Sequence, residues 1–338
     1  MAATIYQVAD RAGVSIATVS RVLRGTAPVA PHTRRRVLSA VDELRYRPSR
    51  PARSLAEGLH AATGSVVPDL SGPYYAEVVL GYETVAAELG RSVLNLSTHG
   101  REREAAGLVA DLASRVDGLV LLGRTVDDEV VLELTRSGTP VVTISRPALP
   151  GVDAVRTENR GSAAALATHL MTHGYQDVVF LGDVEASFDA HERWAGLAET
   201  FGAAGRPSPR QVACSYDEQH GSTAAAELLS RPGRPDVLVC ANDEIALGAL
   251  LAAEAAGLRV PEDVALTGWD DVMAALYSRP GLTTVRQPMR RLGALAAQRL
   301  HERIVGARRE AVHEVLPTQL VIRASCGNHP HPENEEER

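Results

Sequence analysis

The sequence predicts two parts of different fold class. The first is an all-α helix-turn-helix head, and the second is a two-lobed α/β body in which parallel sheets carry helices on both faces. A chain of 338 residues is too long for one core and predicts two or three domains. The N-terminal segment shows short helical patterns, and the rest of the chain shows strand–helix alternation. The first part carries a net positive charge and the second a net negative charge.

The chain has a net charge of −7, but its N-terminal segment is basic. Residues 1–60 contain ten Arg and four acidic residues, a net of +6, which leaves −13 for the remainder. A basic head on an acidic body predicts that only the head binds a polyanion. No apolar leader opens the sequence and no run approaches a membrane span, so we expect a cytoplasmic chain without a membrane partner.

Two short helices joined by a tight turn are predicted near the N-terminus. Residues 5–12 show apolar side chains at helical spacing after Thr4, a capping residue. Gly13 suits a left-handed helix end, and Ser15 suits the cap of a second helix over residues 16–24. This is the helix-turn-helix pattern. The alternative is an ordinary pair of helices whose arginines form a solvated face.

In a helix-turn-helix, the N-terminal turn of the second helix enters the major groove. Arg21 would then donate two bonds to guanine O6 and N7, while Ile16 and Ala17 would touch thymine methyls. The candidate phosphate contacts are the hydroxyl groups of Thr4, Tyr6, Ser15, Thr18 and Thr33. Such contacts fix the register of the protein on the duplex but do not read its sequence. The predicted DNA-binding residues of the head are Thr4, Tyr6, Ser15, Ile16, Ala17, Thr18, Ser20, Arg21 and Thr33.

A third helix is predicted over residues 31–45, because Pro31 suits a first helical turn and the apolar residues share one face. A proline-punctuated linker follows and runs into a short, weakly apolar helix near Leu55. A helix this short is marginal alone in water, so we expect it to fold only on DNA.

Beyond residue 61, short apolar runs alternate with amphipathic stretches. Candidate strands cover residues 65–67, 92–96, 118–122, 141–144, 177–181, 236–240 and 263–267, and candidate helices cover 75–89, 161–173, 223–229 and 244–256. This alternation predicts parallel sheets, and the length suffices for two lobes. Ligands of such sheets bind at the carboxyl ends of strands, in a cleft between lobes.

Polar and aromatic side chains follow these strands, as a site for a polyol or a base requires. The predicted effector-binding residues are Asp69, Ser71, Tyr74, Tyr75, Ser145, Arg146, Ser187, Asp189, Arg193, Asn242, Trp269 and Asp270. Several have a structural alternative. Asn242, Asp243 and Asp270 also suit helix caps, Trp269 also suits the core, and the two tyrosines also suit ordinary packing.

The run from Val8 to Leu23, VADRAGVSIATVSRVL, resembles the LacI/GalR family of bacterial repressors, as do Arg47-Pro48 and residues 52–55. The resemblance continues through nearly the whole chain. It implies a homodimer on palindromic operator DNA, in which the linker forms a hinge helix that pairs with its twin. Ala52 and Arg53 then belong to that hinge, and Leu55 wedges into the minor groove.

In the body, the run RWAG at residues 193–196 resembles the family's Arg-x-x-Gly motif, whose Arg contacts the ligand. Residues 241–248, 260–264, 268–271 and 280–288 also follow the family pattern, the last as a crossover between lobes. The resemblance implies a periplasmic-binding-protein-like body and adds Tyr216 to the effector site. Ser145 departs from the Asp of many sugar-responsive members, which weakens the case for a standard hexose. Ala30 replaces the usual Ser cap of the third helix.

The predicted domains are a helix-turn-helix domain over 1–46, a hinge over 47–60, an N-terminal lobe over 61–157 plus about 286–315, a C-terminal lobe over 158–285 plus about 316–326, and a disordered tail over 327–338. The three cysteines show no metal-ligand spacing, so neither a metal site nor a cofactor is expected.

Together these patterns predict a transcriptional regulator, a repressor, controlled by a small-molecule effector such as a sugar, a polyol or a nucleobase-like compound. The alternative is a solute-binding protein that feeds a transporter, which fits the body but not the basic head. An enzyme is not expected, because no Gly-x-Gly-x-x-Gly follows a strand and neither a P-loop nor a catalytic triad can be assembled.

Overall fold

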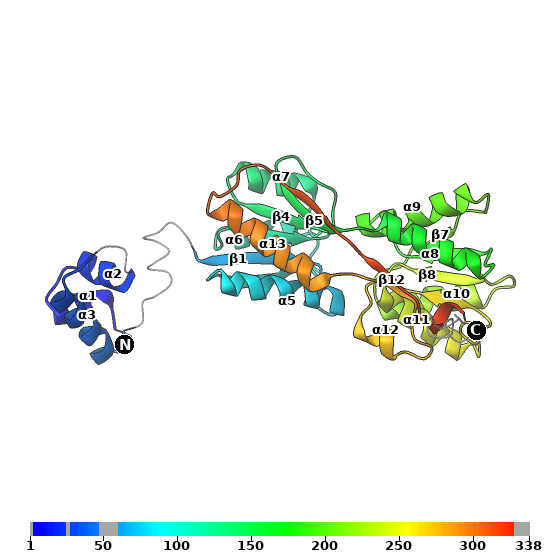
Figure 1. Cartoon of the computed structure of the whole chain (residues 1–338), viewed down its shortest axis with the longest axis horizontal. Coiled ribbons are helices and arrows are strands. Elements are labelled where there is room, and N and C mark those ends of the chain that lie inside the picture. Colours follow the sequence, from blue (N-terminus) through cyan, green and yellow to red (C-terminus); the bar gives the residue numbers. More distant parts are fainter. Residues whose placement is uncertain (1–2, 25–27, 47–59, 328–338) are drawn as a thin grey trace, which may run out of the picture. The chain divides into compact units, whose positions relative to one another are not determined.

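The computed structural model describes residues 3–24, 28–46 and 60–327. It divides into two units, Met1–Ala61 and Ala62–Arg338, which we call the head and the body (Figure 1). The predicted hinge residues Ala52, Arg53 and Leu55 lie outside the described residues, as does the tail beyond Gly327.

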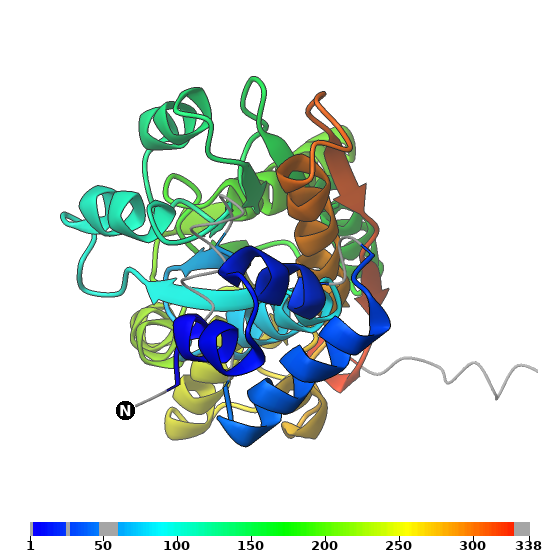
Figure 2. The same cartoon turned by 90° about the vertical axis from the view of Figure 1, so that its left-hand side faces the viewer.

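The head consists of α1 (Ile5–Ala12), α2 (Ile16–Arg24) and α3 (Pro31–Glu43), drawn in blue in Figures 1 and 2. Thr4 caps α1 by accepting a hydrogen bond from the backbone of Gln7, and Gly13 ends the helix at a φ of +59°. This left-handed conformation suits Gly because it has no Cβ. The predicted helix-turn-helix geometry therefore forms.

One fully buried valine from each helix makes the centre of the head's core: Val8, Val19 and Val37. Arg36 of α3 donates hydrogen bonds to the carbonyl groups of Ala12 and Gly13, which ties the third helix to the turn. These carbonyl groups are left without a helical partner where α1 ends, so the guanidinium stabilises the turn directly.

The N-terminal lobe of the body is a six-stranded parallel sheet with the order β11-β5-β4-β3-β1-β2. Its strands are β1 (Ala62–Val67), β2 (Ser92–Ser97), β3 (Leu119–Leu122), β4 (Val141–Ile144), β5 (Asp153–Thr157) and β11 (His313–Leu316). Its helices are α5 (Pro73–Glu88), α6 (Ala105–Ala113), α7 (Asp128–Arg136) and α13 (Met289–Ile304).

Helices cover both faces of this sheet. Successive residues of a strand point to opposite faces, so neighbours in the sequence pack against different helices. Val67 and Val120 pack with α5 and α13, whereas Val66 and Leu121 pack with α6 and α7. Fully buried parallel strands of this kind are rich in Val, Ile and Leu, as these strands are.

The C-terminal lobe is built around a four-stranded parallel sheet with the order β7-β6-β8-β9. Its strands are β6 (Val178–Leu181), β7 (Arg210–Val212), β8 (Val237–Cys240) and β9 (Ala265–Thr267), and its helices are α8 (Arg160–Thr172), α9 (Phe188–Ala203), α10 (Glu218–Leu229), α11 (Asp243–Ala255) and α12 (Met273–Tyr277). A short antiparallel pair, β10 (Thr284–Arg286) and β12 (Gln319–Val321), leads into the 3-10 turn η1 (Ala324–Cys326).

Three segments cross between the lobes: residues 157–160, 286–289 and 316–319. They are hydrogen-bonded to one another. The backbone of Glu158 donates to Leu316 over 2.8 Å, and the hydroxyl of Thr157 donates to the side-chain oxygen of Gln287 over 2.5 Å. In Figure 1, β12 and the N-terminal end of α13 lie next to these three crossovers.

The predicted fold class is confirmed, with parallel sheets covered by helices on both faces. Within the described residues, no helix combines the length and the apolar character needed to cross a membrane.

Candidate DNA interface and effector cleft

The outward face of α2 carries the side chains predicted to read DNA. Ile16, Ala17 and Arg21 are exposed, whereas Val19 and Val22 point into the core of the head. Ser20 and Thr18 are half-buried at the edge of this face. A single helical surface thus combines a guanidinium, two apolar groups and hydroxyls, which is the chemistry of base-edge recognition.

Two of the predicted phosphate contacts also build the fold locally. The Ser15 hydroxyl accepts a hydrogen bond from the backbone of Thr18 over 3.2 Å at the start of α2, and Thr4 caps α1. Tyr6 is 70% exposed, and Thr33 lies half-buried in the first turn of α3. Helix N-termini and their hydroxyl groups are common phosphate ligands.

A cleft of about 930 Å³ lies in the body and is lined by both lobes. Its walls contain most of the predicted effector residues, namely Asp69, Ser71, Tyr74, Tyr75, Ser145, Ser187, Asp189, Arg193, Tyr216, Asn242 and Asp270. The first five come from the N-terminal lobe and the others from the C-terminal lobe. A cleft of this size suits a small metabolite.

Arg146 and Trp269 do not line the cleft, which corrects the place we expected for them. Arg146 is 1% exposed and pairs with Asp128, because its side chain turns back against α7. Trp269 is also 1% exposed and belongs to the core of the C-terminal lobe. The alternative reading of Trp269 as a core residue is therefore correct.

Arg193 is the centre of a buried polar network on the C-terminal side of the cleft. Its Nε donates to Asn159 over 2.8 Å, and its Nη1 donates to the carbonyl of Ala241 over 2.6 Å. Its guanidinium lies 4.6 Å from the centre of the Trp269 ring, an arrangement that stabilises a cation. Asn159 also donates to Asp189 over 3.0 Å. The guanidinium is thus held in one orientation before any ligand binds.

Asp270 is buried at the carboxyl end of β9 and accepts a hydrogen bond from Gln287 over 2.6 Å. Its φ of +117° lies in the region that favours glycine, as does the φ of +57° at Ser145 across the cleft. Strained backbone of this kind gathers at binding sites, where the surrounding structure holds it. Both residues line the cleft.

The remaining predicted residues are held by local bonds. Tyr74 and Ser145 share a hydrogen bond of 3.0 Å, and the Ser71 hydroxyl donates to Asp69 over 2.6 Å. Asn242 accepts from the backbone of Ile245 over 2.9 Å and so caps α11, as its structural alternative predicted. Asn242 lines the cleft as well, so the two readings are compatible.

Burial changes the protonation chemistry of two carboxyl groups in the cleft. Desolvation raises the pKa of Asp270, against the opposing effects of Arg193 and Gln287. Desolvation, together with the charges of Glu218, Asp270, Asp69 and Asp217, raises the pKa of Glu244 to about 7. The charge of the cleft therefore changes near neutral pH.

Sequence reasoning missed Asn159, Glu244 and Gln287, which the structure brings into the cleft or its network. Asn159 follows β5 and Gln287 follows β10, and neither strand was recognised from the sequence. Glu244 stands directly after the Asn242-Asp243 pair, so an extended reading of that strand end would have found it.

A helix-turn-helix head and a bilobed body with a polar cleft are the two parts of a ligand-responsive transcriptional regulator. Residues 4–49 match the family model of bacterial regulatory proteins, lacI family, and residues 167–326 match the periplasmic binding protein-like domain. The chain is 32% identical to the HTH-type transcriptional repressor PurR of Photobacterium profundum, over 96% of this chain and 98% of that protein. The chain therefore belongs to the LacI family.

Solved structures agree. The structure of the lac repressor dimer bound to operator and the anti-inducer ONPF superposes with a TM-score of 0.87 at 27% identity, covering 97% of this chain and all of that one. A complex of the transcriptional regulator CelR with cellobiose superposes with a TM-score of 0.72 at 32% identity, covering 96% and 99%. These relatives do not favour the solute-binding alternative.

Proposed function

We propose that the chain is a repressor that binds a palindromic operator as a homodimer, and that a small molecule in the cleft sets its affinity for that operator. The exposed face of α2 supports the DNA contact, with Arg21 as the residue that reads a guanine. The relatives support the rest, because one is a repressor and another is a dimer bound to operator.

The observation that carries the proposal is the Arg193 network. It joins a cleft-lining guanidinium to Asn159, which lies on the first crossover between the lobes. A ligand that contacts Arg193 and the N-terminal lobe together favours one arrangement of the lobes over another. The crossovers change with the arrangement of the lobes, because Asn159 is part of one of them.

The cleft also indicates the class of effector. Its lining is rich in hydrogen-bond acceptors, with Asp69, Asp189, Asp270 and Glu244, and it presents the rings of Tyr74, Tyr75 and Phe188. Carboxylates accept hydrogen bonds from hydroxyl groups, and rings cover the apolar face of a sugar. We infer that the effector is a sugar or a polyol, in line with the cellobiose complex of CelR.

The test has two arms. In the first, the purified chain selects duplexes from a random pool, and we expect an enriched motif with two-fold symmetry. In the second, sugars, polyols and nucleobases are screened for a rise in melting temperature, since a ligand of the folded state stabilises it. No enriched duplex would contradict the repressor, and stabilisation by a nucleobase alone would contradict the assigned effector class.

A further inference from the structure

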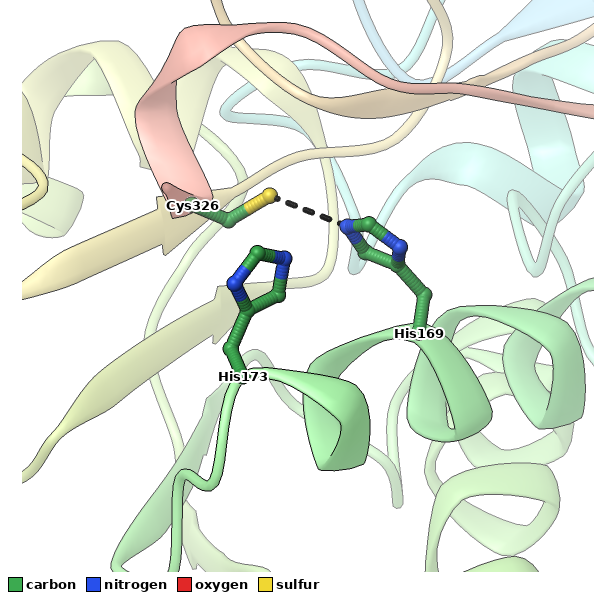
Figure 3. Close-up of side chains that lie close together, drawn as sticks. All are labelled: His169, His173 and Cys326. Carbon is green, nitrogen blue, oxygen red and sulfur yellow. Dashed lines mark hydrogen bonds between the residues drawn. The ribbon is translucent and has the colours of Figure 1, made fainter. Parts of the chain in front are cut away.

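Three side chains that the function above does not use come together in the C-terminal lobe: His169, His173 and Cys326 (Figure 3). One nitrogen of each imidazole and the sulfur of Cys326 lie within 4.8 Å of one another. The Nε2 of His169 and the Sγ of Cys326 are 3.4 Å apart, and the two imidazole rings meet edge to face at 5.0 Å. We call these three residues the His-His-Cys cluster.

The chain holds this cluster in place by bonds that need no ligand. His169 and His173 are four residues apart at the C-terminal end of α8, so they lie on one face of the helix. The neighbour of Cys326, Ser325, donates to Leu266 over 2.6 Å, and Tyr175 donates to the carbonyl of Cys326 over 3.0 Å. The end of η1 is thereby fixed to β9 and to the turn that follows α8.

Two imidazoles and one thiolate form a ligand set that zinc prefers, because Zn²⁺ is a borderline-soft ion bound by nitrogen and sulfur. Bond lengths of about 2.0–2.1 Å to nitrogen and about 2.3 Å to sulfur in a tetrahedron place the ligand atoms roughly 3.3–3.7 Å apart. The separation of 3.4 Å between His169 and Cys326 meets this requirement. The C-terminal end of α8 adds a partial negative charge that favours a cation.

We propose that the His-His-Cys cluster binds one Zn²⁺ ion through His169 Nε2, a nitrogen of His173 and the thiolate of Cys326, with water at the fourth position. On binding, the thiol of Cys326 releases its proton to solvent, and His169 binds the ion through Nε2 in the tautomer that carries its proton on Nδ1. The thiol then gives up the hydrogen bond that it donates to the Thr283 hydroxyl over 3.1 Å, and this hydroxyl keeps its own bond to the carbonyl of Arg323.

The ion would connect α8, which follows the first crossover, to η1, which follows the third. None of its three ligands lines the effector cleft. The site therefore stabilises the C-terminal lobe and its crossovers independently of the effector, and it does not depend on the proposed function.

Cobalt is the probe of choice, because a bond between Co²⁺ and a thiolate gives a charge-transfer band in the near ultraviolet. The full-length chain, freed of metal by chelation, is titrated with Co²⁺ and then with Zn²⁺. We expect one Co²⁺ ion per chain with that band, displaced by Zn²⁺, and a rise in melting temperature with Zn²⁺. Cys326→Ser should lose the band, and His169→Gln should weaken binding by more than about tenfold.

Two controls separate this site from other donors. Cys214→Ser removes a different half-buried cysteine and should keep the band. A chain that ends at Gly327 lacks His329 and His331 and should also keep it. The proposal is overturned if the full chain shows no band, if Cys326→Ser keeps it, or if the shortened chain loses it. Should Cys326→Ser fail to fold, the half-buried His169→Gln decides, because unchanged cobalt affinity in that variant also overturns the proposal.

Discussion

At the scale of single residues, the cleft is preorganised by polar groups that satisfy one another. Arg193 donates hydrogen bonds to Asn159 and to the carbonyl of Ala241, and Asp270 accepts one from Gln287. Buried polar groups without partners are costly, so these bonds hold the side chains in place in the empty cleft. A ligand then finds the site in its binding geometry and loses little free energy in ordering it.

Asp270 should make the stability of the protein depend on pH in an unusual direction. Burial raises its pKa in the folded protein above the ordinary value near 3.8, so the folded state binds more protons between the two pKa values. The contribution of this group to the free energy of unfolding therefore falls as the pH rises from about 4 through the raised pKa of the folded state. Asp270→Asn removes that loss, so the variant should gain stability relative to the parent as the pH rises. Denaturant unfolding measured at pH 5 and pH 8 checks this, and parallel pH profiles of the two proteins would contradict it.

Arg21 should determine base preference rather than overall affinity alone. Arg21→Ala removes a bidentate donor and should cost about 1–3 kcal/mol at one base pair, with relaxed selection there. Thr33→Ala is the matched comparison, because loss of a phosphate contact weakens all duplexes about equally. Affinity measured on a set of single-base operator variants distinguishes the two. An unchanged preference in Arg21→Ala would reject its role in readout.

Residue-level prediction from the sequence succeeded where a strand was recognised. Asp189 and Arg193 follow the predicted strand that became β6, and Asp270 follows β9. It failed at Arg146 and Trp269, because a strand end alone does not say whether a side chain turns toward the cleft or back against its own lobe. The assignment of all these residues to an effector stays a prediction.

At the scale of elements, each lobe contains a pair of helices that touch at glycines. A Cβ on Gly81 of α5 would lie closer than 3.0 Å to the backbone of Arg290 on α13, and a Cβ on Gly293 would meet the backbone of Val78. Gly221 and Gly248 form the same arrangement between α10 and α11. Glycine is required at these crossings because backbone atoms, which cannot move aside, occupy the place of a side chain.

Gly81→Ala should therefore destabilise the protein by about 1–3 kcal/mol, since the two helices must separate to admit the methyl group. Gly107→Ala is the matched control, because nothing lies within 4 Å of its Cβ position on α6. The control should gain about 0.5–1 kcal/mol from the higher helix propensity of Ala. Chemical denaturation of both variants measures these changes. Equal stabilities for the two variants would show that α5 and α13 are not packed as described.

The strands that the sequence predicted are the strongly apolar ones. The predicted strand at 141–144 agrees with β4, and the helix predicted over 75–89 is α5, shifted by one or two residues. Strands β5, β7, β10, β11 and β12 were not predicted. Each of them contains polar or charged residues, so none shows the unbroken apolar run that marks a buried strand, although most of β5 is buried.

At the scale of the whole body, the three crossovers link the cleft to both lobes. Gln287 lies on the second crossover, where it donates to Asp270 in the cleft and accepts from Thr157 on the first. The third is bonded to the first, because the hydroxyl of Thr318 donates to the carbonyl of Glu158 over 2.8 Å. We therefore expect that a ligand in contact with Asp270 or Arg193 acts on these crossovers.

The central claim is that occupancy of the cleft controls binding of DNA, and one titration tests it most directly. Operator affinity is measured against concentration of the stabilising sugar or polyol for the parent chain, Arg193→Lys and the surface control Arg231→Lys, whose side chain is exposed and lies outside the crossovers. We predict that the ligand changes the operator Kd of the parent and the control by about fivefold or more. Arg193→Lys should keep the ligand-free affinity but need about 10–100 times more ligand, since Lys lacks the fork of donors. A ligand that stabilises the body yet leaves the operator Kd of the parent unchanged would contradict the account.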